Sequence, residues 1–157
     1  MKTRVLLVDD HNIVRLGLMT LIIEQPGLEV VGEAGTAAEA VRAVERLSPD
    51  VVLMDIRMPG EGGIEATRQI TARFPRTRVV MLTSYADDEL VVRAIRAGAV
   101  GYVLKQVDNK ELLRAIEAAG RGEAVLDAAT TSRLLARMRQ VERKADEDAF
   151  RELSDRE

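Results

Sequence analysis

The chain has 157 residues, of which 46% are hydrophobic, and this is enough to build one compact domain with an appendage. It contains no cysteine and a single histidine, which excludes disulfide bridges, thiolate metal sites and histidine-rich metal sites. The 23 basic and 26 acidic residues give a formal net charge of -3, so a generally basic nucleic-acid-binding surface is absent. Any bound metal ion therefore needs oxygen ligands.

The N-terminal residues show no targeting signal. The chain enters a short apolar run at Val5, without the longer apolar region and the cleavage site of a secretory signal. No apolar run approaches the length that is needed to cross a bilayer. We therefore expect a cytoplasmic protein that does not contact a membrane.

Strand-like and helix-like segments alternate five times in the first part of the chain. Short apolar runs predict strands at residues 5–8, 28–32, 51–55, 79–82 and 101–104. Each run is followed by apolar residues at helical spacing, and the connections are short. This alternation predicts a parallel sheet with helices on both faces. We expect a flavodoxin-like, doubly wound (βα)5 fold with strand order 2-1-3-4-5.

The same spacing predicts which helix residues face the core. On the first helix, one side carries the apolar set Ile13, Val14, Gly17, Leu18, Leu21 and Ile22. The second helix opens with Thr36-Ala37-Ala38-Glu39, a capping box in which the hydroxyl and the carboxylate each satisfy a free backbone N–H.

The pattern changes from Asp127 onward to a single amphipathic helix that no strand follows. Its apolar face carries Leu134, Leu135, Met138 and Val141. We place the globular domain at residues 1–124 and the linker helix at 125–152. Two interpretations of this helix stay open, namely a tail docked on its own domain and a connector or dimer contact.

Polar residues follow four of the predicted strands. Asp9 and Asp10 end the first strand, Asp55 the third, Thr83 the fourth and Lys105 the fifth. Because the carboxyl ends of parallel strands lie at one edge of a sheet, three carboxylates should face one crevice. Their mutual repulsion raises their pKa values unless a cation lies between them. Mg2+, which takes oxygen ligands and retains several waters, is the expected ion.

With that ion, this set of residues suits phosphoryl transfer. Asp55 is a carboxylate nucleophile that can accept a phosphoryl group, and Mg2+ and the Lys105 ammonium neutralise its oxygens. The Thr83 hydroxyl can donate a hydrogen bond to one of them. Phosphorylation adds a charge of about -1.5 to -2, which would draw these groups inward and provide a switch. His11 is expected to start the first helix without a special role.

Four ordered motifs resemble the receiver domain of two-component response regulators of the NarL/LuxR type. They are Leu7-Val8-Asp9-Asp10-His11, Leu53-Met54-Asp55-Ile56-Arg57-Met58-Pro59, Leu82-Thr83-Ser84 and Gly101-Tyr102-Val103-Leu104-Lys105. The resemblance covers residues 3–124. It implies that a sensor histidine kinase phosphorylates Asp55. It also implies that the protein is not an enzyme but a phosphoacceptor that assists its own phosphorylation and dephosphorylation.

The resemblance also implies roles for further residues. Mg2+ would be bound by Asp10, by Asp55 and by the backbone carbonyl of Arg57, and Asp9 would act through water. Thr83 and Lys105 would bind the phosphoryl group.

Two further pairs are similar to positions that regulate the family. Thr83 and Tyr102 resemble the switch pair, in which the hydroxyl moves to the phosphoryl group and the ring turns inward. Arg57 and Tyr85 match positions that tune the lifetime of the phosphorylated state.

The chain departs from many receivers at Gln106, because proline often follows the lysine there. Residues 153–157 resemble the opening of a LuxR-type helix-turn-helix domain. We therefore expect part of a longer transcription factor that forms a homodimer on phosphorylation. It would contact promoter DNA only through a C-terminal domain that is missing from this chain.

Two alternatives use similar residues. A haloacid-dehalogenase-like phosphatase also combines an aspartate nucleophile, Mg2+, a hydroxyl and a lysine, but its second aspartate follows two residues after the nucleophile. Here Asp9 and Asp10 are adjacent and residue 12 is asparagine, so that pattern fails. A phosphorylation-independent interaction module needs no acidic set, and the complete set argues against it.

Overall fold

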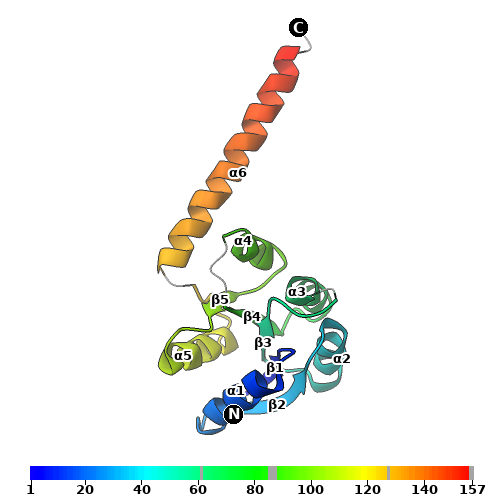
Figure 1. Cartoon of the computed structure of the whole chain (residues 1–157), viewed down its shortest axis with the longest axis vertical. Coiled ribbons are helices and arrows are strands. Elements are labelled where there is room, and N and C mark those ends of the chain that lie inside the picture. Colours follow the sequence, from blue (N-terminus) through cyan, green and yellow to red (C-terminus); the bar gives the residue numbers. More distant parts are fainter. Residues whose placement is uncertain (61, 85–87, 127, 156–157) are drawn as a thin grey trace.

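The computed structural model describes residues 1–60, 62–84, 88–126 and 128–155. Five parallel strands form one sheet in the order β2-β1-β3-β4-β5, with helices on both faces (Figure 1). The strands are β1 (Thr3–Val8), β2 (Leu28–Ala34), β3 (Val51–Asp55), β4 (Arg78–Thr83) and β5 (Gly101–Leu104). The helices are α1 (Asn12–Ile23), α2 (Ala37–Leu47), α3 (Gly62–Arg73), α4 (Asp88–Arg96), α5 (Asn109–Gly120) and α6 (Ala128–Asp155). The predicted fold class and strand order are confirmed.

The central strands are buried on both faces, as expected for a parallel sheet. Alternate side chains of β1 and β3 enter two separate hydrophobic cores. Leu6 and Met54 pack under α2, α3 and α4, whereas Leu7 and Leu53 pack under α1 and α5. Because both cores are filled, the sheet forms a rigid base, and the ends of β1 and β3 are held in register.

The predicted inward face of α1 is partly wrong. Ile13 is 84% exposed and Gly17 is exposed, whereas Ile22 is fully buried and Leu18 packs at the edge of the core. Apolar residues occupy both sides of this helix, and Leu16 is also exposed. The helical period therefore identified the inward side correctly at Leu18, Leu21 and Ile22, but it extended that side too far, to Ile13 and Gly17.

The threonine half of the predicted capping box of α2 is confirmed, whereas the glutamate has a different partner from the one expected. The Thr36 hydroxyl accepts a hydrogen bond from the Glu39 N–H over 3.1 Å. The Glu39 carboxylate accepts one from the Gly35 N–H over 3.0 Å, so the glutamate reaches one residue beyond the cap.

The sheet is extended by a short segment after α5. The N–H of Val125 donates to the carbonyl of Val100 over 2.8 Å, and the N–H of Tyr102 donates to the carbonyl of Val125 over 3.1 Å. The chain thus stays hydrogen-bonded to β5 up to the residues immediately before α6.

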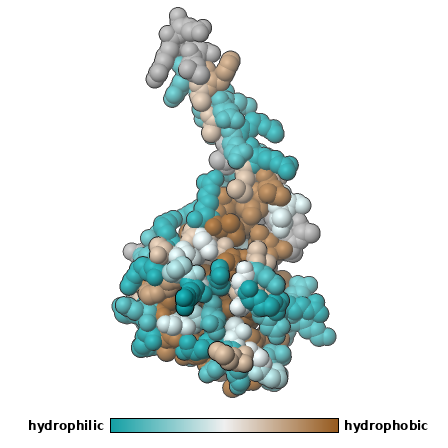
Figure 2. Space-filling model, turned by 180° about the vertical axis from the view of Figure 1, so that it is seen from behind, coloured by the Kyte–Doolittle hydropathy of each residue, from teal (hydrophilic) through white to brown (hydrophobic). Residues whose placement is uncertain are grey.

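Helix α6 contacts the domain through residues near its start. Leu134 is buried against the core under α4, and Arg137 pairs with Glu89 of α4. Leu135 and Met138 stay exposed, and the side chain of Val141 lies outside the described part. The rest of the helix extends away from the domain (Figure 1). Figure 2 shows hydrophobic surface gathered at the base of α6 and mostly hydrophilic surface beyond it.

Among the described residues, each helix is either too short or too polar to cross a membrane.

Candidate functional site

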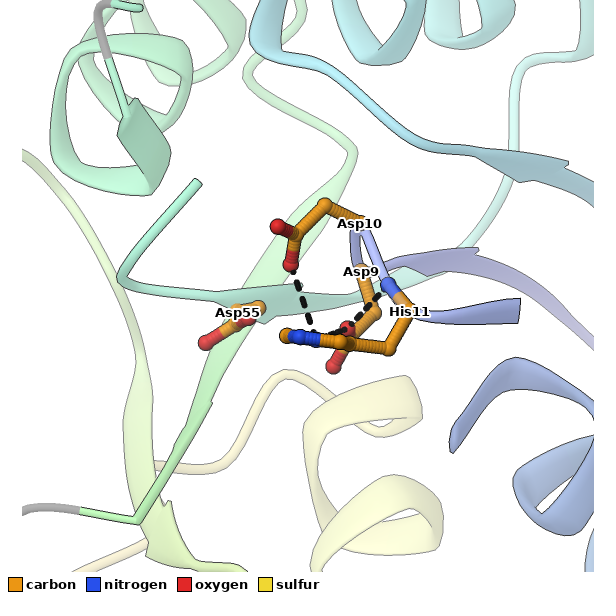
Figure 3. Close-up of side chains that lie close together, drawn as sticks. All are labelled: Asp9, Asp10, His11 and Asp55. Atoms are coloured by element: carbon orange, nitrogen blue, oxygen red, sulfur yellow. Dashed lines mark hydrogen bonds and ion pairs between the residues drawn. The ribbon is translucent and has the colours of Figure 1, made fainter. Parts of the chain in front are cut away.

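The register of β1 and β3 brings two acidic residues together. Val8 pairs with Met54, so Asp9 and Asp55 are the next residues of two neighbouring strands. Together with Asp10 and His11, each offers a ligand atom, and these atoms lie within 4.8 Å of one another. Figure 3 shows the three carboxylates grouped around one space at the carboxyl edge of the sheet. The predicted convergence of the acids is confirmed.

Asp9 has protein partners on both carboxylate oxygens. The side chain is 2% exposed, and its Oδ1 accepts a hydrogen bond from the His11 backbone N–H over 2.9 Å. Its Oδ2 accepts one from the Lys105 ammonium, also over 2.9 Å. These two donors hold the carboxylate in one orientation.

Asp10 is held differently. Its side chain is 26% exposed, but its Oδ1 atom is buried and accepts no well-aligned hydrogen bond from the residues that the structure describes; the His11 Nδ1 lies 3.0 Å from it as an ion-pair contact. Buried polar atoms are normally paired, so this oxygen is a candidate for a ligand bond.

The His11 imidazole lies over the acidic pair (Figure 3). Its Nδ1 is 3.0 Å from Asp10 Oδ1 and 3.1 Å from Asp9 Oδ1. The ring thus belongs to the site, although the sequence predicted no special role for it. Its position directly after the acidic pair was the one available signal.

Asp55 is 6% exposed, and its surroundings alter its acidity. Burial raises the pKa of its carboxyl above the usual value, and the nearby Asp9 carboxylate raises this pKa further. The Lys105 ammonium and the Arg57 N–H act in the opposite direction, and they lie 3.8 Å from Oδ2 and 3.3 Å from Oδ1. Asp10 adds a smaller upward contribution. An additional cation would therefore favour the ionised carboxylate.

Thr83 and Lys105 continue the same edge of the sheet. Thr83 pairs with Leu104 in the β4–β5 ladder, and the Lys105 N–H donates to the Thr83 carbonyl over 2.7 Å. Thr83 is buried one residue beyond Leu82, which pairs with Asp55. The two residues therefore lie on the Asp55 side of the sheet, as predicted.

The remaining predicted site residues occupy different environments. Tyr102 is buried in the core beside α4, so its ring is already inside the protein. Arg57 is exposed, and Tyr85 lies outside the described residues. The peptide bond between Lys105 and Gln106 is trans.

Gly63 packs closely against the backbone of Asp55. A Cβ atom at this position would overlap the carbonyl oxygen of Asp55 and approach Ile56 Cα. The Gly63 N–H donates to the Ile56 carbonyl over 2.9 Å. The start of α3 is therefore packed directly against the backbone that presents Asp55.

The residues at this edge fit a hard divalent cation. They offer three carboxylates, one buried oxygen without a hydrogen-bond donor, and a desolvated Asp55. Oxygen ligands and retained waters are what Mg2+ requires.

Comparisons with known proteins point in the same direction. Residues 5–117 match the model of the response regulator receiver domain. The chain is 45% identical over 143 residues to the DNA-binding transcriptional activator DevR/DosR of Mycobacterium tuberculosis, covering 91% of this chain and 66% of the relative. It is 46% identical over 136 residues to the transcriptional regulatory protein LiaR of Bacillus subtilis, covering 87% and 64%. The chain thus spans slightly less than two thirds of these relatives.

Solved structures show the same likeness. A LuxR-family two-component response regulator from an Aurantimonas species matches with a TM-score of 0.82 and 40% identity, over 88% of this chain and 99% of that chain. The isolated receiver domain of RcsB from Salmonella enterica, solved in the presence of the phosphomimetic BeF3-, matches with a TM-score of 0.74 and 26% identity, over 85% and 99%. These comparisons give the phosphatase alternative no support.

Proposed function

Because this chain belongs to the response regulator receiver domain family, we propose that Asp55 accepts a phosphoryl group from a sensor histidine kinase. The observation that carries this proposal is the acidic cluster. Ligand atoms of Asp9, Asp10 and Asp55 lie within 4.8 Å of one another, and the Lys105 ammonium contacts two of the three carboxylates.

The proposed reaction transfers a phosphoryl group from a histidine nitrogen of the kinase to a carboxylate oxygen of Asp55. An ionised oxygen of Asp55 forms a bond to the phosphorus of the kinase phosphohistidine while the P–N bond breaks, and the electron pair of that bond stays on the imidazole nitrogen. The product is an acyl phosphate on Asp55. The protein turns over no separate substrate, since it assists only its own phosphorylation and dephosphorylation.

We assign the Mg2+ ligands from the state of each oxygen. Asp10 and Asp55 would bind the ion directly, and the backbone carbonyl of Arg57 would complete the protein ligands. Asp9 would act through water, because both of its oxygens already accept hydrogen bonds within the protein. When bound, the ion supplies positive charge that neutralises the phosphoryl oxygens.

Lys105 and Thr83 would bind the phosphoryl group. The Lys105 ammonium stands 3.8 Å from Asp55, so a short movement away from Asp9 brings it to a phosphoryl oxygen. Thr83, at the end of the neighbouring strand, would donate its hydroxyl to another oxygen. Its displacement would be sensed by the buried Tyr102 as the second member of a switch pair. Arg57 and Tyr85 would tune the lifetime of the acyl phosphate.

We propose that the full protein controls transcription. In this proposal residues 1–124 form the receiver, residues 125–152 the linker helix, and residues 153–157 the start of a LuxR-type DNA-binding domain that contacts promoter DNA. The similar proteins DevR/DosR and LiaR are named as transcriptional regulators, which supports this assignment.

Phosphorylation would favour a homodimer by shifting an existing equilibrium between two conformations. Of the two candidate faces, the one formed by α1 and α5 is better supported. Ile13, Leu16 and Ile23 form an exposed apolar stripe along α1. The alternative face at α4 and β5 is partly covered, because Leu134 of α6 is buried beside α4.

The proposed function is tested by chemical phosphorylation. The full chain is incubated with acetyl phosphate and Mg2+, and its intact mass is measured after rapid acidification. Wild type should gain one phosphoryl group, and Asp55→Asn should gain none. Asp146→Asn, which changes an exposed carboxylate on α6, is the matched control and should behave as wild type. An inert wild type, or an Asp55→Asn variant that is modified equally, would overturn the proposal.

A further inference from the structure

Arg15, in the first turn of α1, joins three separate segments around the acidic pair. Its Nη1 donates a hydrogen bond to the backbone carbonyl of Asp9, and its Nη2 donates to the side-chain oxygen of Asn12. Its Nε donates to Oε1 of Glu33 on β2 over 3.2 Å. The Arg15 side chain is only 16% exposed, and its bond to the Asp9 carbonyl is partly buried.

The carbonyl group that Arg15 binds belongs to the peptide bond between Asp9 and Asp10. A peptide group is planar, so fixing its carbonyl also fixes the direction in which the Cα of Asp10 lies. The preceding peptide is fixed as well, because the Asp9 N–H donates to the Ala34 carbonyl over 3.1 Å. The backbone is therefore held on both sides of Asp9.

Asp10 depends on this backbone support. Its buried Oδ1 accepts no well-aligned hydrogen bond within the described part of the chain, and the exposed imidazole of His11 lies 3.0 Å from it. Asp9, in contrast, is oriented by two donors to its own carboxylate. The support that the protein gives to the Asp10 side chain thus comes through the Asp9–Asp10 peptide, which fixes the position of the Asp10 Cα.

We propose that Arg15 is a positioning residue for the metal site, because it fixes this peptide so that the Asp10 carboxylate faces the ion before the ion arrives. The inference rests on the proposed function, since it takes Mg2+ as the occupant. A ligand that is already oriented loses less conformational freedom on binding, so the affinity is higher. The planar fork of arginine suits three acceptors in different directions, whereas a lysine ammonium does not reproduce this geometry.

Because Arg15 is a cation, the proposed positioning role and its charge predict opposite changes in Mg2+ affinity when it is replaced. Removing a cation that contacts the backbone of the acidic pair should, by electrostatics alone, attract Mg2+ more strongly. A residue that only stabilises the fold should lower the melting temperature and leave the Mg2+ affinity unchanged. Loss of positioning should instead weaken Mg2+ binding. The three roles therefore give three different results.

The test is isothermal titration calorimetry of MgCl2 into the full chain. Arg15→Gln should weaken Mg2+ binding about tenfold, which corresponds to about 1.4 kcal/mol. Arg15→Lys keeps the charge but not the fork, and it should weaken binding to a similar extent. Glu33→Gln keeps the bond to the Asp9 carbonyl and should change the affinity by less than about threefold, or roughly 0.65 kcal/mol. Arg42→Gln removes one positive charge from an exposed position on α2, so it controls for the loss of charge alone.

The outcomes separate this inference from the proposed function. If wild type does not bind Mg2+, the proposed function fails and the inference fails with it. If wild type binds Mg2+ and both Arg15 variants bind it equally or more tightly, the inference alone is overturned. If Arg15→Gln does not fold, as judged by circular dichroism, Arg15→Lys decides the result.

Discussion

The ammonium of Lys105 donates a hydrogen bond of 2.9 Å to Oδ2 of Asp9, although the two residues are 96 positions apart in the sequence. They end strands that are not neighbours, because β3 and β4 lie between β1 and β5. The same ammonium is 3.8 Å from Oδ2 of Asp55. The positive charge of a single lysine therefore offsets part of the repulsion between the two carboxylates.

Replacing this lysine should destabilise the protein when no Mg2+ is present. We expect Lys105→Ala to lower the free energy of unfolding by about 1–3 kcal/mol, because the buried Asp9 carboxylate loses a charged donor. Mg2+ should restore part of this loss by supplying another positive charge. Urea denaturation with EDTA and with Mg2+ measures both effects. Lys110→Ala, an exposed change on α5, should stay within about 0.5 kcal/mol of wild type. Equal stability of Lys105→Ala and wild type would contradict this prediction.

Asp55 should make stability depend on pH in a defined direction. Burial raises the pKa of its carboxyl in the folded protein above the ordinary value of 3.8, so the folded state holds the proton more tightly than the unfolded state. The resulting stabilisation is fully present below the unfolded pKa and is lost as the pH rises through the folded pKa. At neutral pH the ionised carboxylate therefore opposes folding.

The variant Asp55→Asn reveals this contribution because it cannot ionise. In EDTA it should melt at a higher temperature than wild type at neutral pH. The difference should shrink as the pH falls towards 3.8. Thermal melts followed by circular dichroism across this range provide the measurement. A difference that grows on acidification would show that the sign is wrong.

The contact between Gly63 and the Asp55 backbone should not tolerate a methyl group. We expect Gly63→Ala to cost about 1–3 kcal/mol of stability through overpacking. It should also slow phosphorylation by acetyl phosphate, because the shifted backbone carries Asp55. Gly17→Ala is the matched control, since a Cβ there meets no atom within 4 Å and the residue lies within α1. It should stabilise the protein by about 0.4–1 kcal/mol. Similar effects of the two changes would count against the contact.

The exposed stripe on α1 should be needed for dimerisation but not for folding. Leu16→Glu should prevent the dimer that forms with beryllofluoride and Mg2+, while stability changes by less than about 0.5 kcal/mol. Leu135→Glu places the same charge on an exposed apolar position of α6 and should leave the dimer intact. Analytical ultracentrifugation compares the variants. The opposite pattern would assign the dimer contact to α6.

The strands and the acidic cluster were predictable because both follow from local signals and one rule of topology. Apolar runs predicted the strands, and Asp9 and Asp55 converge because parallel strands end at one edge of the sheet. The exposure of Ile13 was not predictable, because Ile13 and Ile22 are equally apolar but lie in opposite environments. Hydrophobic spacing placed Leu18, Leu21 and Ile22 correctly, but it does not show where the inward face ends when apolar residues continue onto the other side of a helix.

The contacts of Arg15 could not be predicted for a different reason. Its acceptors are the Asp9 carbonyl and the Glu33 carboxylate, which lie 6 and 18 positions away. Nothing in the residue types at these positions indicates that one side chain bridges them. Such a bridge depends on how closely α1 approaches β2, and only coordinates supply that distance.

Helix α6 projects a long segment away from a short region of contact with the domain. Its 28 residues are anchored near one end, where Leu134 and Arg137 contact α4. The roughly 18 residues beyond Arg137 span about 27 Å, so a tilt of about 10° at the anchor would sweep the far end through about 5 Å. A subtle rearrangement of the receiver would thus become a large displacement at whatever the helix carries.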